Sequence, residues 1–187
     1  LSVPFTFPVP AVNRLTLPLL ASLYYQRQRR RVAHALVHYD PYFYPLDAIA
    51  DWNRAYGPRG FLQYQCVLPP DAAEAGVAEL LRRIARAGAG SFTSVLKVFG
   101  ERASAGILSF PRPGATLALD FPNHGEATLR LLDELDAIVA TAGGAVYPAK
   151  DARLPGARFR AFFPNWQHLQ PYLDPRFSSG FWRRVTE

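Results

Sequence analysis

The chain has 187 residues, a formal net charge of +6 and a hydrophobic content of 49%. This apolar fraction can bury a core, which excludes a disordered chain, and the length fits one sizeable domain or two small ones. The single cysteine excludes an internal disulfide and a cysteine-based zinc cluster, and the four histidines lack the spacing of metal ligands. We therefore expect a folded domain without a metal site.

Residues 1–33 are predicted to form a proline-stiffened connector with a short helix near residues 15–25. Prolines break its apolar stretch, which never reaches the about 18 residues that a membrane span needs. Its basic run, residues 27–31, follows the apolar stretch, whereas in a signal peptide the basic residues come first. The chain lacks methionine, so we expect a processed product or a piece of a longer protein. These features favour a location in the cytoplasm or peripheral to the inner membrane.

The basic run RQRRR leaves two interpretations open, a solvated loop or a contact with a membrane surface. A nucleic-acid partner is disfavoured, because the chain has no RNA-binding motif and no interleaving of basic with aromatic residues. We therefore expect no nucleic-acid partner.

Beyond residue 33, hydrophobic periodicity and turn residues predict an alternation of strands and helices. The predicted strands cover residues 34–44, 61–69, 91–99, 107–111, 115–121 and 145–147. The predicted helices cover residues 46–56, a stretch capped by Asp71 that ends near residue 87, residues 125–141, and short segments within 155–187.

Two stretches of the chain repeat one series of parts: the end of a strand, a proline, a helix, a glycine-containing turn and another strand. Each stretch is a β-α-β unit. Two such units in tandem predict an α+β fold, with a mostly antiparallel sheet, helices on one face and a ferredoxin-like pseudo-repeat. This architecture hosts many functions, so it does not by itself identify one.

Alternation along three predicted strands separates polar from apolar side chains. Gln63 and Gln65 share one face of their strand, while Cys66 lies on the opposite face and is expected to be a buried, inert thiol. Lys97 and Thr116 lie on the polar side of the next two strands. An ordinary solvent-facing side of an antiparallel sheet explains such a face. Matched donors and acceptors for a polyhydroxylated ligand explain it too.

Lysine is rare in this chain, since 19 of the 21 basic residues are arginines and only Lys97 and Lys150 are lysines. A lysine in the middle of a strand is costly unless it is solvated or paired. Lys150 follows a short predicted strand, where a cation can either cap a surface loop or face developing negative charge. Both lysines are therefore candidate functional residues.

Four segments in order along the chain resemble the C-terminal, substrate-binding half of a family of flavin-dependent sugar oxidoreductases. This family is that of the decaprenylphosphoryl-β-D-ribose oxidases, and the aldonolactone oxidases of the vanillyl-alcohol-oxidase superfamily are more distantly similar. The segments are YPLDAIADWNRAYGPRGFLQYQCVLP (44–69), SFP (109–111), LALDFPN (117–123) and GGAVYPAKDARL (143–154). The resemblance implies a preceding FAD-binding domain joined by residues 1–33, with residues 34–187 as a substrate-binding cap domain.

The same resemblance implies roles for the polar residues. Lys150 would be the catalytic residue beside the flavin, with Tyr147 and Ala149 lining the cofactor. Gln63, Gln65 and Lys97 would bind the substrate. Three further pocket positions depart from the family pattern, because Phe43 stands for a tyrosine, Thr116 for an asparagine and Ala118 for a cysteine.

The implied reaction oxidises a secondary alcohol of a sugar or polyprenyl-phosphate sugar to a ketone, by hydride transfer to FAD. FAD would be bound mainly by the preceding domain, so this chain alone would be inactive. The alternatives are a sugar- or lipid-phosphate-binding module without chemistry, and a structural or nucleic-acid-binding α+β domain.

Overall fold

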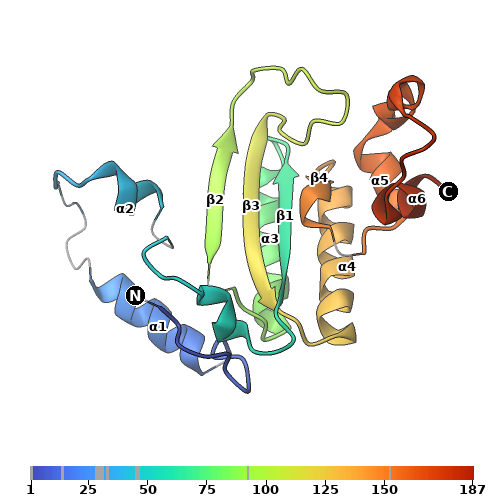
Figure 1. The fold of residues 1–187 in the computed structure, drawn as a ribbon. Coiled ribbons are helices and arrows are strands. Elements are labelled where there is room, and N and C mark those ends of the chain that lie inside the picture. Colours follow the sequence, from blue (N-terminus) through green and yellow to red (C-terminus); the bar gives the residue numbers. More distant parts are fainter. Residues whose placement is uncertain are drawn as a thin grey trace.

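A computed structural model describes residues 2–13, 15–27, 32, 34–44, 47–91, 93–151 and 153–187. Its centre is a four-stranded antiparallel sheet with the order β2-β3-β1-β4 (Figure 1). The strands are β1 (Phe61–Leu68), β2 (Ser94–Phe99), β3 (Gly114–Pro122) and β4 (Ala145–Val146). The predicted α+β class with an antiparallel sheet is therefore confirmed.

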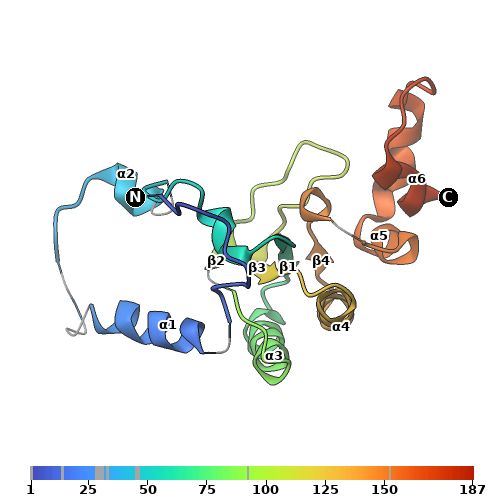
Figure 2. The same cartoon turned by 60° about the horizontal axis from the view of Figure 1, so that its bottom comes forward.

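Two helices, α3 (Ala73–Arg86) and α4 (Glu126–Thr141), pack on the same side of the sheet (Figure 2). Each has an apolar stripe at helical spacing, which includes Leu80 and Ile84 in α3 and Leu135 and Val139 in α4, all buried. They face the apolar side of the strands and form the core with it. Core residues that the strands contribute on this side include Tyr64, Cys66, Leu68, Leu117, Leu119, Phe121 and Val146.

The chain order β1-α3-β2 and β3-α4-β4 contains both predicted β-α-β units. Strand β3 lies between β1 and β2, and β1 lies between β3 and β4, so the strands of each unit flank one strand of the other. The two units are unequal, because β2 has six residues and β4 only two. The ferredoxin-like pseudo-repeat therefore stays a prediction.

Strand β2 is the outer strand beyond the cover of α3 and α4. Its side chains on the helix side are consequently exposed to solvent, with exposed fractions of 59% for Leu96 and 82% for Val98.

The predicted strand over residues 107–111 is wrong, since these residues form turns and irregular chain. Two prolines nearby, Pro111 and Pro113, lack the N–H group that a strand ladder needs. Asp71 does not cap α3, whose N-cap is Ala72.

The N-terminal region contains α1 (Thr16–Gln26), α2 (Tyr39–Phe43) and the 3-10 helix η1 (Trp52–Tyr56). The predicted short helix near residues 15–25 is confirmed by α1. The predicted strand over 34–44 is wrong, because the chain turns into α2 where the His38 side chain accepts the Asp40 N–H. Only the last part of the predicted 46–56 helix forms, as η1. The basic run lies outside the described residues apart from Arg27.

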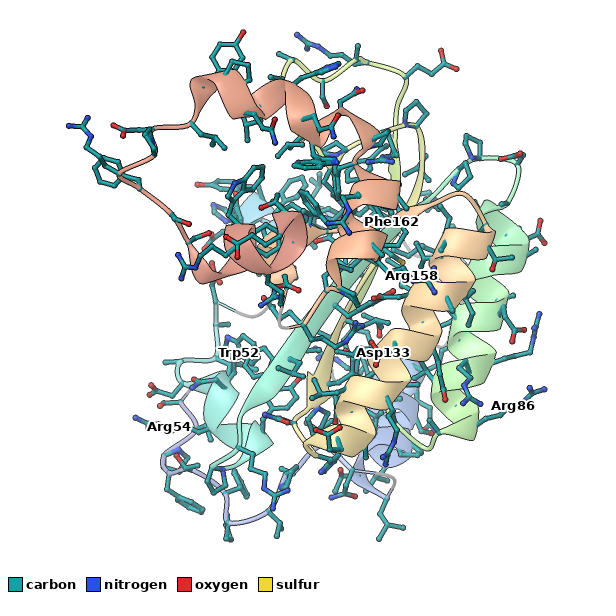
Figure 3. All side chains as sticks on the ribbon, turned by 90° about the vertical axis from the view of Figure 1, so that its right-hand side faces the viewer. Trp52, Arg54, Arg86, Asp133, Arg158 and Phe162 are labelled. Carbon is teal, nitrogen blue, oxygen red and sulfur yellow. The ribbon has the colours of Figure 1, made fainter. Side chains whose placement is uncertain are left out.

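The C-terminal region forms short helices, as its prolines predict: α5 (Gly156–Phe162), η3 (Pro164–Tyr172) and α6 (Gly180–Thr186). In Figure 3, Phe162 and Arg158 of α5 lie toward one end of the strands, and Trp52 and Arg54 of η1 toward the other. Phe159 is fully buried between Phe163, Phe181 and Trp182. This aromatic cluster joins α5 to α6.

Within the described residues, no helix combines the length and the apolar composition required to cross a bilayer.

Candidate functional site

The strand register places the polar side chains on one face of the sheet. Gln63 lies opposite Asp120, Gln65 opposite Ala118, and Lys97 opposite Thr116. Directly paired residues of antiparallel strands point to the same side, and here that side is opposite to α3 and α4. The structure thus brings five of the predicted positions together. We call this surface the polar face, defined by Gln63, Gln65, Lys97, Thr116, Ala118 and Asp120.

The two glutamines have different partners. The Lys150 Nζ donates a hydrogen bond to the Gln63 Oε1 at 2.9 Å. The Gln65 Nε2 donates to the Thr116 Oγ1 at 3.1 Å, and Thr116 is almost fully buried. Gln65 therefore keeps its carbonyl oxygen as an acceptor, whereas the carbonyl oxygen of Gln63 is already occupied by the ammonium group.

The end of β4 positions Lys150. The Tyr147 N–H donates to the Gln65 carbonyl at 2.8 Å, which extends the sheet pairing by one residue, and the 3-10 helix η2 (Pro148–Lys150) follows. The next residue, Asp151, accepts the backbone N–H groups of Arg153 and Leu154 at 2.9 and 2.5 Å. Its carboxylate also pairs with the Arg184 guanidinium of α6. Lys150 is thus held between the sheet and the C-terminal helices.

An aromatic row crosses one end of the polar face. The Tyr147 ring stacks on the Phe110 ring, with centroids 4.5 Å apart and planes 23° apart. Phe110 meets Phe99 of β2 edge to face at 6.1 Å. Phe110 is buried because the chain between β2 and β3 lies over the side of the sheet opposite to the helices (Figure 2). The row forms an apolar wall beside the polar groups.

Asp120 belongs to this site although the motifs did not identify it as a functional residue. It is 7% exposed, and burial raises the pKa of its carboxyl, while a side-chain hydrogen bond from Gln63 and the charge of Lys150 oppose the rise. The signal that could have found it was its alternation with Thr116 and Ala118 in the same strand.

Two predicted residues lie at or beyond the margin of the site. Lys97 is exposed on the outer strand β2, three strand spacings from β4, which is roughly 14 Å between backbones. Phe43 is 66% exposed in α2, which stands apart from the sheet in Figures 1 and 2. Its ring contacts are with its neighbours Tyr42 and Tyr44. The structure does not bring Phe43 to the polar face, and its pocket role stays a prediction.

The helix side of the sheet contains a second buried carboxyl group, which has a structural partner. Asp136 of α4 is 2% exposed and pairs with the Arg153 guanidinium at 2.9 Å. Burial raises the pKa of Tyr64 well above its ordinary value and that of Cys66 to about 12. A thiol with so high a pKa is inert at neutral pH, as the alternation predicts.

Comparison with known proteins gives the following result. No family model matches the chain. In an alignment of 190 positions that covers 99% of the chain, it is 36% identical to a Mycolicibacterium smegmatis protein named decaprenylphosphoryl-beta-D-ribose oxidase, and it covers 40% of that protein. It is 33% identical over 188 residues to a Streptomyces coelicolor protein named only as an uncharacterized protein in the mprA 5′ region, and covers 50% of it. The chain thus spans half or less of the length of these relatives.

The resemblance predicted from the motifs is therefore confirmed, because nearly the whole chain is similar to part of a decaprenylphosphoryl-beta-D-ribose oxidase.

Proposed function

We propose that this chain is the substrate-binding part of a flavin-dependent oxidoreductase. The reaction is the oxidation of a secondary alcohol of a sugar, or of a polyprenyl-phosphate sugar, to a ketone. The name of the M. smegmatis relative supports this substrate class. Residues 1–33 would join the chain to an FAD-binding domain of the same polypeptide, with residues 34–187 as the cap domain.

The observation that carries the proposal is the fixed ammonium group of Lys150. It lies at the end of β4, 2.9 Å from Gln63 Oε1, on the side of the sheet that the helices leave open. A cation held in this way can stabilise negative charge that develops on a substrate oxygen. A freely solvated surface lysine cannot, because its position is not fixed.

The residues around Lys150 fit the flat, partly apolar ring of a flavin. Tyr147 is half-buried and fixed against Phe110, and Ala149 is small and exposed, so a planar group can approach this edge closely. Tyr147, Ala149 and Lys150 would line the cofactor. A bound flavin would supply the acceptor for the hydride of the substrate C–H bond.

The chain's own residues then bind and orient the substrate. Gln65 offers its free carbonyl oxygen to a sugar hydroxyl, and Lys97 offers a point charge to a ring hydroxyl or a phosphate. Thr116 holds the Gln65 amide, and Ala118 leaves room above β3. As the alcohol became a ketone, its C–H hydride would pass to the flavin and its O–H proton to water, and the Lys150 ammonium would stabilise the negative charge on that oxygen.

The test is the replacement Lys150→Ala in the polypeptide that joins this chain to its flavin-binding part. We expect single-turnover flavin reduction by the sugar substrate to slow by at least about a hundredfold, the usual cost of removing one such group. The control Lys97→Ala should weaken substrate binding more than it slows the reduction step. A wild-type rate of reduction in the Lys150→Ala variant would contradict the proposal.

The same experiment separates the alternative. A wild-type polypeptide that binds a polyprenyl-phosphate sugar but reduces no flavin would identify a binding module without chemistry.

A further inference from the structure

We propose that Asp120 is a positioning residue that acts through Gln63 to hold the ammonium group of Lys150. The inference rests on the proposed function, in which Lys150 is the catalytic residue. It assigns Gln63 to the protein's own hydrogen-bond network and leaves Gln65 as the glutamine that meets the substrate.

The backbone fixes Asp120 in the middle of the sheet. It pairs with Gln63 across the β1–β3 ladder, so both side chains point to the polar face. Its own N–H donates to the Ser91 Oγ at 2.7 Å. With 7% exposure, the carboxyl group has little water to solvate it and depends on protein partners.

The amide of Gln63 can face its two neighbours in only one orientation. Its Oε1 accepts from the Lys150 ammonium at 2.9 Å, so the amide NH2, a donor, is the end left for the Asp120 carboxylate across the ladder. The Gln63 side chain thus lies between the two charged groups, as the strand register and the bond from Lys150 require. A carboxylate at one end and an ammonium at the other fix the direction of the amide and polarise it.

The charge of Asp120 reaches Lys150 by way of this amide. None of the ion pairs among the described residues includes Asp120. Lys150 is the charged group that acts on its carboxyl, alongside the hydrogen bond from Gln63. The arrangement is therefore a relay, carboxylate to amide to ammonium, and differs from the direct pair between Asp136 and Arg153 on the other face.

The two lysines make this relay measurable without a flavin. Brief acetylation of the folded chain modifies only the unprotonated form of an amine, and peptide masses report Lys150 and Lys97 separately. Lys97 is exposed and serves as the internal reference. The Asp120→Asn variant keeps the shape of the side chain but removes its charge. We expect the labelling ratio of Lys150 to Lys97 to rise about three- to tenfold, the equilibrium effect of weakening one hydrogen bond, because an ammonium group held less firmly by Gln63 meets the reagent more often.

A second variant tests the route. Gln63→Leu removes the amide between Asp120 and Lys150, so we expect a similar rise in the labelling ratio. In the double variant Asp120→Asn/Gln63→Leu, the ratio should be no higher than in either single variant. The control Asp136→Asn removes a buried carboxylate on the opposite face and should leave the ratio unchanged. A melting temperature for each variant separates these effects from loss of folding.

In the polypeptide with its flavin-binding part, Asp120→Asn should lower kcat for flavin reduction about tenfold with little change in KM, because Lys150 is displaced and Gln65 is not. An unchanged labelling ratio in Asp120→Asn overturns the inference. Additive effects in the double variant overturn the route through Gln63. A third outcome separates the two proposals. If the wild-type polypeptide reduces no flavin, but the labelling ratio of Lys150 to Lys97 still rises in Asp120→Asn, then the proposed function fails and the positioning role of Asp120 stands.

Discussion

Two buried aspartates, one on each side of the sheet, show how the same side chain is stabilised in different ways. Asp136 has a guanidinium partner, Arg153, at 2.9 Å. Asp120 has the amide of Gln63 and, beyond it, Lys150. An ion pair with arginine is a structural solution, because it neutralises the charge directly. The amide carries no net charge and leaves Lys150 as the cation near Asp120, which suits a group that holds that cation in a site open to ligand.

The titration of Asp120 gives a prediction for stability against pH. Burial raises the pKa of its carboxyl, so the folded state takes up this proton more readily than the unfolded chain. Its contribution is fully present below the unfolded pKa and is lost as pH rises through the folded pKa. The free energy of unfolding of the wild type minus that of Asp120→Asn should therefore be larger at pH 4 than at pH 7.

Urea unfolding of both proteins at the two pH values measures this difference. The matched control is Asp174→Asn, because the side chain and backbone of Arg176 lower the pKa of the exposed Asp174 carboxyl. The free energy of unfolding of the wild type minus that of Asp174→Asn should therefore be larger at pH 7 than at pH 4. Equal differences at both pH values for Asp120→Asn would contradict the raised pKa.

At the scale of elements, the shortest strand controls the site. Strand β4 has two residues, pairs with Cys66 and Val67 of β1, and leads directly to Tyr147 and Lys150. Gly144, the residue before β4, packs so closely against β1 that a Cβ atom at this position would lie 2.3 Å from the Val67 carbonyl oxygen. No side chain fits at this distance, so the backbone would have to move.

The replacement Gly144→Ala is expected to destabilise the fold by about 1–3 kcal/mol, because it overpacks the junction of β4 with β1. The matched control is Gly100→Ala, where a Cβ would meet nothing within 4 Å. Chemical denaturation measures both. The labelling ratio of Lys150 to Lys97 should also change in Gly144→Ala alone, since the shift displaces Lys150. Equal free energies of unfolding for the two variants would show that Gly144 does not pack tightly against Val67.

For the whole molecule, the notable feature is the uneven cover of apolar groups. The core lies between the sheet and α3 and α4, whereas α1 has no buried residue. Leu19 and Leu23 of α1 are exposed by 61% and 56%. Surfaces of this kind promote association between molecules.

We expect the double variant Leu19→Gln/Leu23→Gln to change the free energy of unfolding by less than about 0.5 kcal/mol per site, as exposed positions usually do. It should lower self-association in sedimentation velocity, because fewer apolar groups face water. The contrasting variant Leu135→Gln, at a fully buried position, should prevent stable folding. A large loss of stability in the α1 variant would show that this helix packs on the fold.

Features of the fold that depend on short stretches of sequence could be predicted, whereas features that depend on a distant partner could not. A strand alternates its side chains wherever it pairs, so the sequence alone predicts that Gln63 and Gln65 share a face and that Cys66 is buried. The helical stripe of α4 is equally local. The strand predicted over residues 34–44 failed, because its apolar and aromatic residues do not specify a partner strand, and the turn at His38 begins a helix instead.

The sequence by itself determined the α+β class, the polar face and the two exceptional lysines, because periodicity and composition are properties of short segments. The tertiary structure alone decided which lysine meets which glutamine. Lys150 and Gln63 are 87 residues apart and are joined by the antiparallel pairing of β4 with β1, while the pairing of β1 with β3 sets Asp120 beside Gln63. Strand order and register depend on the packing of the whole sheet, which no local pattern contains.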